Sequence, residues 1–599
     1  MSTSTNVITD PAADVVVLGL GVTGGIVATD LAQAGYNVVG IEKGPYWDFS
    51  TDFAPVKYDE WGIGFHRKFD HPIPMSTYTI RNNDDQYALA ARRNTALQVI
   101  VMGHGVGGMA QHYAGAMGRY GPWNYQMASE TASKYGSGFL ESIDPTNDVQ
   151  DWPMTYEDYE PFYVEWEQAW GLTGTNQGPL VPMSKNYPMP PHPFTEQATQ
   201  YQSAAEAMGY SPYPTPNSLA SEAYVNQYGV SVNGCVYDGW CGAACNYVCE
   251  VGAKANSAFR VVPAAIKTGK FTMKTNSYVF RLDTDSTTGL VTAARYYDAS
   301  GNVHVQPGKV FWNGLWGFNI PRLMQLSGIG QTYNPASGKG TIGRGVTATG
   351  TPGLASASGS LAIGGNSYSA GNASGGGVSI YDFADDNFDH TGLNFIGGGV
   401  VSVGGYQGGG PANFTGIAGA ATVNSMGSTY KASLKNRYLP TKLTVALGPA
   451  PAELADTRWH LDLDPHHDDM YGDPLERITM DWANNAVNGA SHLAPLMEPI
   501  LTKLGATNIT VNKGTPAGTT SMDNWQAHTR GGCRIGSSSS SSVFNKYQQA
   551  WTTPNLFAGG EITNTHGSSV TAGTHAIGPT TYVGVEGIKK YLQSPGPLV

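Results

Sequence analysis

An unbroken apolar run followed by closely spaced glycines marks the first structural unit of the chain. Residues 14–18 (DVVVL) predict a buried parallel strand, because a strand covered on both faces shows no alternation of polar positions. A glycine-rich loop over 19–24 follows, and then a helical stretch over 25–35 that ends in glycine. A second apolar stretch, 36–42 (YNVVGIE), predicts the next strand. This order predicts a Rossmann-type unit that binds a dinucleotide.

Each glycine of the loop has a physical task in such a unit. Gly19 permits the tight turn, Gly21 lets the backbone approach the pyrophosphate, and Gly24 lets the helix pack against the strand. The helix N-terminus offers N–H groups to the phosphates. Glu42 closes the second strand, where an acid accepts hydrogen bonds from ribose hydroxyls and disfavours NADP. The alternative is an ordinary glycine turn, and the loop by itself does not separate FAD from NAD.

Composition narrows the class of protein. A chain of 599 residues is too long for one simple core, so two or more domains are expected. A net charge of −12 argues against a nucleic-acid partner, which requires a basic face. The N-terminus lacks the basic and apolar regions of a signal peptide, and no apolar run is long enough to span a membrane. We expect a cytoplasmic protein, or a periplasmic one if it is exported with a partner subunit.

Several further stretches resemble the glucose-methanol-choline (GMC) oxidoreductase superfamily, nearest the FAD sugar and gluconate dehydrogenase catalytic subunits and pyranose oxidase. The resemblance lies in residues 105–113 (GVGGMAQHY), 151–163 (DWPMTYEDYEPFY), 528–536 (HTRGGCRIG), 554–561 (PNLFAGGE) and 578–581 (GPTT). It implies FAD as the cofactor. Beyond the first loop it implies flavin contacts from Gly107, Gly108, Val279, Gly560, Glu561 and Thr580. His112 is a candidate for covalent attachment of FAD, the alternative being a histidine packed beside the flavin.

The same resemblance implies a catalytic pair. Oxidation of an alcohol needs a proton acceptor beside the hydroxyl group, and His528 matches the histidine that serves as the family's base. The second group of the family, Asn or His, aligns here with Gly578, which has no side chain. His575 is the preferred substitute and His566 the other candidate. The alternative is that no second group exists.

Four cysteines crowd into one loop, at positions 235, 241, 245 and 249. The spacing of Cys235, Cys241 and Cys245 resembles that of the ligands of an iron–sulfur cluster in the sugar dehydrogenases, with Cys249 left over. Reduced structural cysteines and a zinc site are the alternatives.

The expected fold class is α/β (α+β overall), with a Rossmann-type FAD-binding domain and an interleaved substrate domain on a mostly antiparallel sheet. The FAD-binding domain is assigned to 10–130, 245–335 and 520–599, and the substrate domain to 140–235 and 340–515. We expect oxidation of a sugar, polyol or other alcohol, with electrons passing to a non-oxygen acceptor such as an electron-transfer subunit or a quinone. The alternatives are a pyranose-oxidase-like enzyme that reduces dioxygen to hydrogen peroxide, and a flavin-bearing scaffold whose catalytic pair has decayed.

Overall fold

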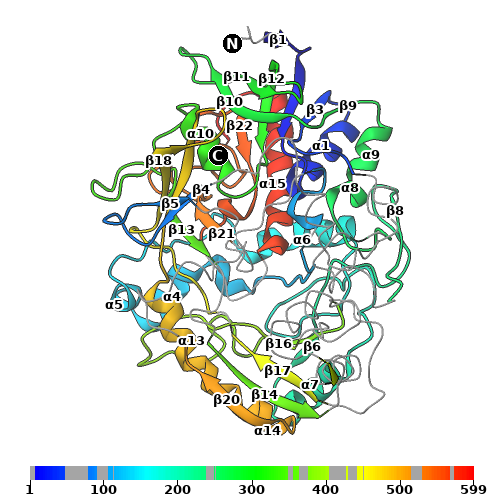
Figure 1. The fold of residues 1–599 in the computed structure, drawn as a ribbon, viewed down its shortest axis with the longest axis vertical. Coiled ribbons are helices and arrows are strands. Elements are labelled where there is room, and N and C mark those ends of the chain that lie inside the picture. The colour runs from blue at the N-terminus through cyan, green and yellow to red at the C-terminus, as the bar shows by residue number, and fades with distance from the viewer. Residues whose placement is uncertain are drawn as a thin grey trace.

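A computed structural model provides the structure of the chain. It describes residues 7–47, 78–90, 105–111, 113–237, 249, 251–348, 355–362, 375–403, 427–428, 442–449, 451–514, 529–566 and 573–598. Within these ranges the larger sheets and the longest helix lie in the upper half of Figure 1, and smaller sheets with their helices lie in the lower half.

An eight-stranded sheet contains the predicted Rossmann unit (Figure 1). Its strands are β1 (Val7–Thr9), β2 (Ala13–Leu18), β3 (Val38–Ile41), β9 (Phe271–Lys274), β10 (Tyr278–Thr284), β11 (Val291–Tyr297), β12 (Val303–Asn313) and β22 (Leu556–Ala558). The order is β10-β11-β12-β2-β3-β9, with β1 and β22 also paired to β12. The central strands are parallel, whereas β10 and β11 pair in antiparallel fashion. The predicted buried strand and its parallel neighbour are confirmed.

Helices cover this sheet. They are α1 (Val22–Gln33), α8 (Ser257–Arg260), α9 (Val262–Lys267) and α15 (Thr574–Gln593). α1 contacts the other three and is buried over most of its length, which accounts for the few polar residues in its sequence. α15 runs down the centre of the molecule in Figure 1 and packs against α6 (Tyr156–Trp170). The N-terminus of α6 is a capping box, in which the Thr155 hydroxyl and the Asp158 carboxylate each accept a backbone N–H.

A second sheet has six strands in the order β21-β13-β18-β19-β4-β5. They are β21 (Thr529–Gly532), β13 (Arg344–Ala348), β18 (His460–Asp468), β19 (Pro474–Thr479), β4 (Tyr78–Arg81) and β5 (Leu89–Ala90). Only the pairing of β19 with β4 is parallel, so the sheet is mostly antiparallel, as expected. Strands β4 and β21 come from segments assigned to the FAD-binding domain, yet they pair with strands of the other domain. The domain limits stay a prediction.

The lower part of the molecule is built on two small antiparallel sheets. Their strands are β17 (Lys442–Leu447), β14 (Ser356–Ala362) and β20 (Thr507–Asn512), and β16 (Val401–Val403), β15 (Val378–Ile380) and β6 (Pro212–Pro214). The helices packed on them are α7 (Glu196–Ala207), α13 (Asn484–Leu496) and α14 (Glu498–Lys503). A further hairpin pairs β7 (Tyr224–Val225) with β8 (Ser231–Val232). Helices α4 (Met127–Tyr135) and α5 (Phe139–Ile143) pack on each other.

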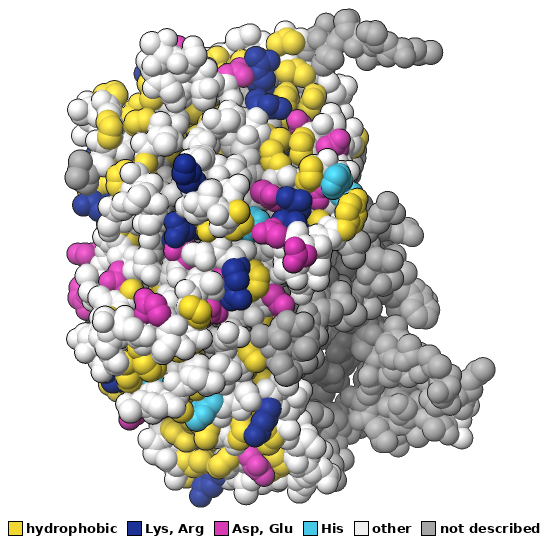
Figure 2. Space-filling view, turned by 90° about the vertical axis from the view of Figure 1, so that its left-hand side faces the viewer, with side chains coloured by type: hydrophobic (Ala, Val, Ile, Leu, Met, Phe, Trp, Pro, Cys, Tyr) yellow, Lys and Arg dark blue, Asp and Glu magenta, His cyan; other side chains and the backbone are white. Residues whose placement is uncertain are grey.

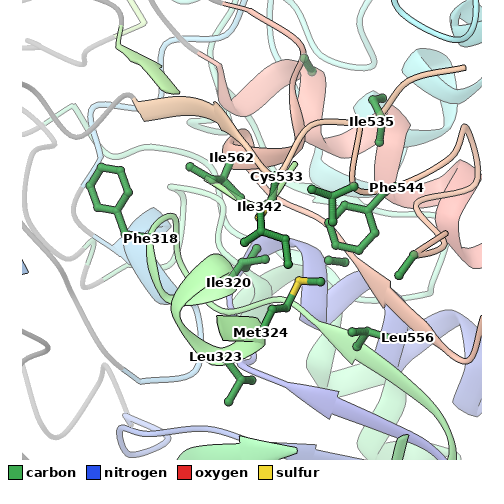
Figure 3. Packing of buried hydrophobic residues seen from close by; sticks show 14 of the residues in the cluster. Phe318, Ile320, Leu323, Met324, Ile342, Cys533, Ile535, Phe544, Leu556 and Ile562 are labelled. Atoms are coloured by element: carbon green, nitrogen blue, oxygen red, sulfur yellow. The ribbon is translucent and has the colours of Figure 1, made fainter. Parts of the chain in front are cut away.

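One hydrophobic cluster joins the C-terminal segment to the rest of the core (Figure 3). Helix α10 (Asn319–Leu326) and the residue before it contribute Phe318, Ile320, Leu323 and Met324. Ile342, Cys533, Ile535, Phe544, Leu556 and Ile562 pack against them. This burial holds the segment after β21, which contains much of the predicted flavin-binding sequence, against the strand-to-helix junction that follows β12.

The surface agrees with the composition. On the face shown in Figure 2, basic and acidic side chains are few and interspersed, without a broad patch of either sign. In the part of the chain that the structure describes, no helix combines the length and the apolar character needed to cross a membrane.

Candidate active site

The loop after β2 adopts a backbone that requires glycine. Gly19 has a φ of +81°, and a Cβ there would lie 2.9 Å from the carbonyl oxygen of Gly314. A Cβ on Gly24 would lie 1.9 Å from the carbonyl oxygen of Gly19, so α1 packs this closely only without a side chain. The N–H of Gly19 donates to the carbonyl of Ile41 over 2.8 Å, which ties the loop to β3. The two glycines meet the packing requirement of a nucleotide loop, while their contact with a cofactor stays a prediction.

The predicted flavin-covering segment lies directly on this loop. The N–H of Gly107 donates to the carbonyl of Leu20 over 3.0 Å. A Cβ on Gly108 would lie 2.8 Å from the Cα of Gly21. The φ values of Gly107 and Gly108, +113° and +54°, also favour glycine at both positions. Two glycine segments far apart in the sequence therefore meet backbone to backbone, as a shared cofactor site requires.

The first turn of α1 is suited to hold the pyrophosphate of FAD. Gly21 is the N-cap, and because it has no side chain, the amides that begin the helix receive no side-chain hydrogen bond from it. The first turn carries no acidic residue that would repel a phosphate. Amides at the positive end of a helix bind anions. The residues present fit FAD at this position.

Glu42 connects three parts of the nucleotide site. Its side chain is buried, with one carboxylate oxygen 2.8 Å from the N–H of Leu20. The other oxygen accepts from Gly44 over 2.9 Å and from Gly105 over 3.2 Å. A carboxylate has about four lone-pair sites, so these bonds leave capacity for a ribose hydroxyl. The acid thus also organises the backbone around it, which the sequence did not indicate.

The turn before β10 lies beside the same acid. The N–H of Ser277 donates to the carbonyl of Glu42 over 2.9 Å, and Val279 is buried two residues further along. The ammonium of Lys43 lies 5.0 Å from the ring centre of Tyr278. Burial lowers the pKa of Lys43 to about 8, although the charge of Glu42 acts in the opposite direction. Val279 therefore follows closely on a turn that is tied to Glu42, while its contact with the flavin stays a prediction.

The C-terminal segment returns from β22 into Gly560 and Glu561, and from there toward α15. The hydroxyl of Thr574, the first residue of α15, donates to the Glu561 carboxylate over 3.2 Å. Thr580 lies further along the helix, where its hydroxyl lies 3.1 Å from the carbonyl of Ala576. The Thr580 hydroxyl hydrogen is thus engaged within the helix, so the predicted flavin contact of this residue would involve its backbone or its hydroxyl lone pairs.

The two candidates for the second catalytic group are both fully buried. His575 lies in the first turn of α15, with Nε2 3.1 Å from a carboxylate oxygen of Glu167 and its ring centre 5.1 Å from that of Tyr163. His566 precedes α15, and its ring centre lies 6.4 Å from that of Trp152. Gly578 lies within α15 and packs against α6. Helix α15 thus begins one turn before the position that aligns with the family's second group.

Sequence reasoning missed an ion pair beside His575. Nε of Arg119 lies 2.7 Å from one oxygen of Glu167, and Nη2 lies 2.9 Å from the other. Arg119 also contacts Glu160 and the hydroxyl of Tyr156. Burial alone would lower the pKa of Arg119, but the hydrogen bonds and charge of Glu167 raise it above its usual value. The sign in the sequence that could have indicated this ion pair was Glu167, an acid on the face of α6 whose other buried residues are mostly aromatic.

Four predicted site residues lie outside the described residues: His528, His112, Cys241 and Cys245. Cys235 and Cys249 are half-buried at the two ends of the cysteine loop, and neither takes part in a disulfide. The described ranges hold no group of three or more His, Cys, Asp or Glu side chains arranged to bind a metal, but two of the predicted ligands are not among them. The iron–sulfur site stays a prediction.

Comparison with known proteins gives matches over nearly the whole chain and one match over about half of it. The chain is 31% identical over 605 residues to the gluconate 2-dehydrogenase flavoprotein of Pantoea cypripedii, covering 98% of this chain and 95% of that protein. It is 25% identical to 2-methyl-1,2-propanediol dehydrogenase of Mycolicibacterium austroafricanum, over 96% and 94%. Fructose dehydrogenase large subunit of Gluconobacter japonicus matches at 26% identity over 53% of this chain and 54% of that one.

A similar fold occurs among solved structures. Pyridoxine 4-oxidase from Mesorbium loti aligns with a TM-score of 0.53 and 13% sequence identity, covering 98% of this chain and 100% of that one. No protein-family model matches the chain.

Proposed function

Because the chain belongs to the glucose-methanol-choline family of oxidoreductases, we propose that it oxidises a hydroxyl group of a sugar, a polyol or a related alcohol. It is an FAD-dependent oxidoreductase that acts on CH–OH donors. The observation that carries the proposed substrate class is the match to a gluconate dehydrogenase flavoprotein over 98% of the chain. The packing of the glycines in the loop after β2 and the uncapped amides of α1 support FAD as the cofactor.

The residues divide the work of this reaction. Bound FAD would supply the acceptor for the hydride that leaves the carbinol carbon. The amides at Gly21 and the carboxylate of Glu42 hold the nucleotide. We assign the proton of the substrate hydroxyl to His528, since an imidazole accepts a proton near neutral pH. His575 is the second group, which holds the substrate in place by a hydrogen bond.

We further propose that the electrons leave to an acceptor other than dioxygen, such as a partner subunit or a quinone. Three of the relatives are named as dehydrogenases and one of these as a large subunit, which supports this choice. A cluster held by Cys235, Cys241 and Cys245 would provide the route, since thiolates are the usual ligands of iron–sulfur centres. The proposed location is the cytoplasm, or the periplasm if the chain is exported with such a partner.

Anaerobic mixing of the purified protein with a panel of sugars, sugar acids and polyols tests the proposed activity. We expect the flavin absorbance to bleach with at least one of them and to return on addition of a quinone or a dye. Rapid return in air with stoichiometric hydrogen peroxide would instead establish an oxidase. A flavin that no alcohol of the panel reduces would contradict the proposed function and favour a scaffold.

Two chemical measurements test the proposed cofactor chemistry. Acid precipitation leaves the yellow colour in the pellet if His112 carries FAD covalently, and His112→Ala should then release it to the supernatant. Iron and acid-labile sulfide, measured on anaerobically purified protein, should be present in the wild type and lost in Cys241→Ser. Their absence from the wild type would contradict the cluster.

A further inference from the structure

The two ring nitrogens of His575 have different surroundings. Nε2 lies 3.1 Å from an oxygen of Glu167. Nδ1 is buried and has no hydrogen-bond partner in the described structure. A buried polar atom without a partner is costly, so an unpaired nitrogen in an otherwise satisfied network indicates a place for a ligand. The side chain of His575 is fully buried, so this ligand would bind inside the protein.

Arg119 determines which nitrogen of His575 carries the hydrogen. Both oxygens of Glu167 accept from the guanidinium, at 2.7 Å and 2.9 Å, so Glu167 is held as a carboxylate. An ionised carboxylate accepts hydrogen bonds and donates none. The contact between Glu167 and Nε2 therefore requires a hydrogen on Nε2. In neutral His575 the lone pair is then on Nδ1.

The surroundings favour the neutral ring. Burial lowers the pKa of His575, and the positive charge of Arg119 lowers it further, although Glu167 raises it. Among the described residues, the rings of Tyr163 and Tyr187 also face the imidazole, at 5.1 Å and 6.3 Å between centres. Burial also raises the pKa of both tyrosines, so neither offers a competing charge. Nδ1 is thus a neutral acceptor.

His575 also occupies the appropriate place on α15. It lies three residues before Gly578, and residues with this spacing share one face of a helix. Gly578 aligns with the family's second catalytic group but has no side chain. We propose that Glu167, held by Arg119, is a positioning residue that keeps His575 protonated at Nε2, so that Nδ1 accepts a hydrogen bond from a second hydroxyl of the substrate, next to the hydroxyl whose proton His528 takes. This inference rests on the proposed alcohol oxidation.

Nitrogen-15 NMR of protein labelled at histidine measures the tautomer without any turnover. We expect the His575 signals, identified as those lost in His575→Gln, to show a hydrogen on Nε2 and none on Nδ1. His390 is a matched reference, because it is equally buried but places Nδ1 3.0 Å from Asp386 and leaves Nε2 without a partner. It should show the opposite tautomer. A hydrogen on Nδ1 of His575 in the wild type would overturn the proposal, even if no variant folds.

Anaerobic flavin reduction tests the consequence for catalysis. Glu167→Gln presents an amide that can donate to Nε2, and we expect it to invert or mix the tautomer and to slow reduction at saturating substrate by at least about tenfold. The concentration that gives half-maximal reduction should change less than the rate. His575→Gln should slow reduction similarly, whereas His390→Gln should stay within about twofold of the wild type.

Unchanged reduction rates in both Glu167→Gln and His575→Gln would overturn the positioning role while leaving alcohol oxidation in place. A wild-type flavin that no alcohol reduces would overturn the proposed function together with the substrate contact of His575. The NMR result would then still report on the Glu167–His575 bond, so the two failures are distinguishable.

Discussion

Gly578 lies against the indole ring of Trp166: a Cβ atom on Gly578 would come within 2.2 Å of Cδ2 and 2.4 Å of Cγ of that ring. Helices α15 and α6 therefore approach each other more closely at this point than any side chain would allow. The contact gives a physical reason for the departure from the family pattern, because an asparagine at 578 would collide with Trp166. A second catalytic group on α15 has to come from another turn of the helix.

The first prediction concerns this contact. Alanine normally stabilises a helix interior relative to glycine by about 1 kcal/mol. We expect Gly578→Ala to have the opposite sign and to destabilise the protein by about 1–3 kcal/mol, because the methyl group overpacks the interface with Trp166. Urea denaturation measures the difference. Gly138→Ala is the control, since its φ is −99° and no atom lies within 4 Å of its Cβ position. A stabilised Gly578→Ala would contradict the prediction.

The nucleotide loop was predictable because its determinants are local. The strand 14–18, the glycines and the helix follow one another in the sequence. The position where a Cβ on Gly24 would meet the carbonyl oxygen of Gly19 spans only five residues. The mostly antiparallel second sheet was also expected. Its composition was not, because β4 and β21 pair with partners far away in the sequence. Such pairings depend on the packing of the whole chain rather than on local pattern.

The network at α15 could not be predicted for the same reason. His575 was proposed only as a substitute for a missing side chain, and nothing in the sequence linked it to Glu167 or Arg119. The three residues lie on different segments and meet only after α6 and α15 pack together. The one local sign of this ion pair was Glu167, which lies among aromatic residues on the buried face of α6. The close approach of α15 to α6 at Gly578 had no sign in the sequence beyond the glycine itself.

The second prediction concerns the nucleotide site. Glu42→Gln keeps the size of the side chain but replaces one accepting oxygen with a donating amide, so at least one of its three backbone contacts is lost. We expect a lower flavin content after purification, with FAD affinity reduced by roughly tenfold or more. The ratio of flavin to protein absorbance and titration of the apoprotein measure this. Glu586→Gln, on the exposed side of α15, should retain full flavin content. Equal flavin affinity of Glu42→Gln and the wild type would contradict the assigned role.

The third prediction concerns the buried ion pair. Arg119→Met leaves the Glu167 carboxylate buried and without its bidentate partner, and this should cost about 3–5 kcal/mol in the free energy of unfolding. Lys134→Met is the control, because it removes a pair of similar length, 2.8 Å to Asp386, in which the lysine is 48% exposed. It should cost less than about 1 kcal/mol. Comparable losses of unfolding free energy in the two variants would contradict the prediction that the buried pair contributes more to stability than the exposed pair.

The fourth prediction concerns the pH dependence of stability. His192 is buried, with Nε2 2.7 Å from the carbonyl oxygen of Leu219 and Nδ1 2.7 Å from the hydroxyl of Tyr237. Burial lowers the pKa of His192 to about 4, although the hydrogen bond to Leu219 acts in the opposite direction. In the unfolded chain the pKa is about 6.5. Between these two values the unfolded chain binds the proton and the folded protein does not.

The contribution of His192 is therefore fully present above pH 6.5 and is lost as the pH falls toward 4. The total loss is roughly 3 kcal/mol. We expect His192→Gln to remove this part of the slope, so that urea midpoints measured from pH 7 to pH 4.5 fall less steeply than in the wild type. His466→Gln, at an exposed position of β18, should keep the wild-type slope. Parallel curves for His192→Gln and the wild type would contradict the prediction, because the other titrating groups are common to both proteins and cancel in the comparison.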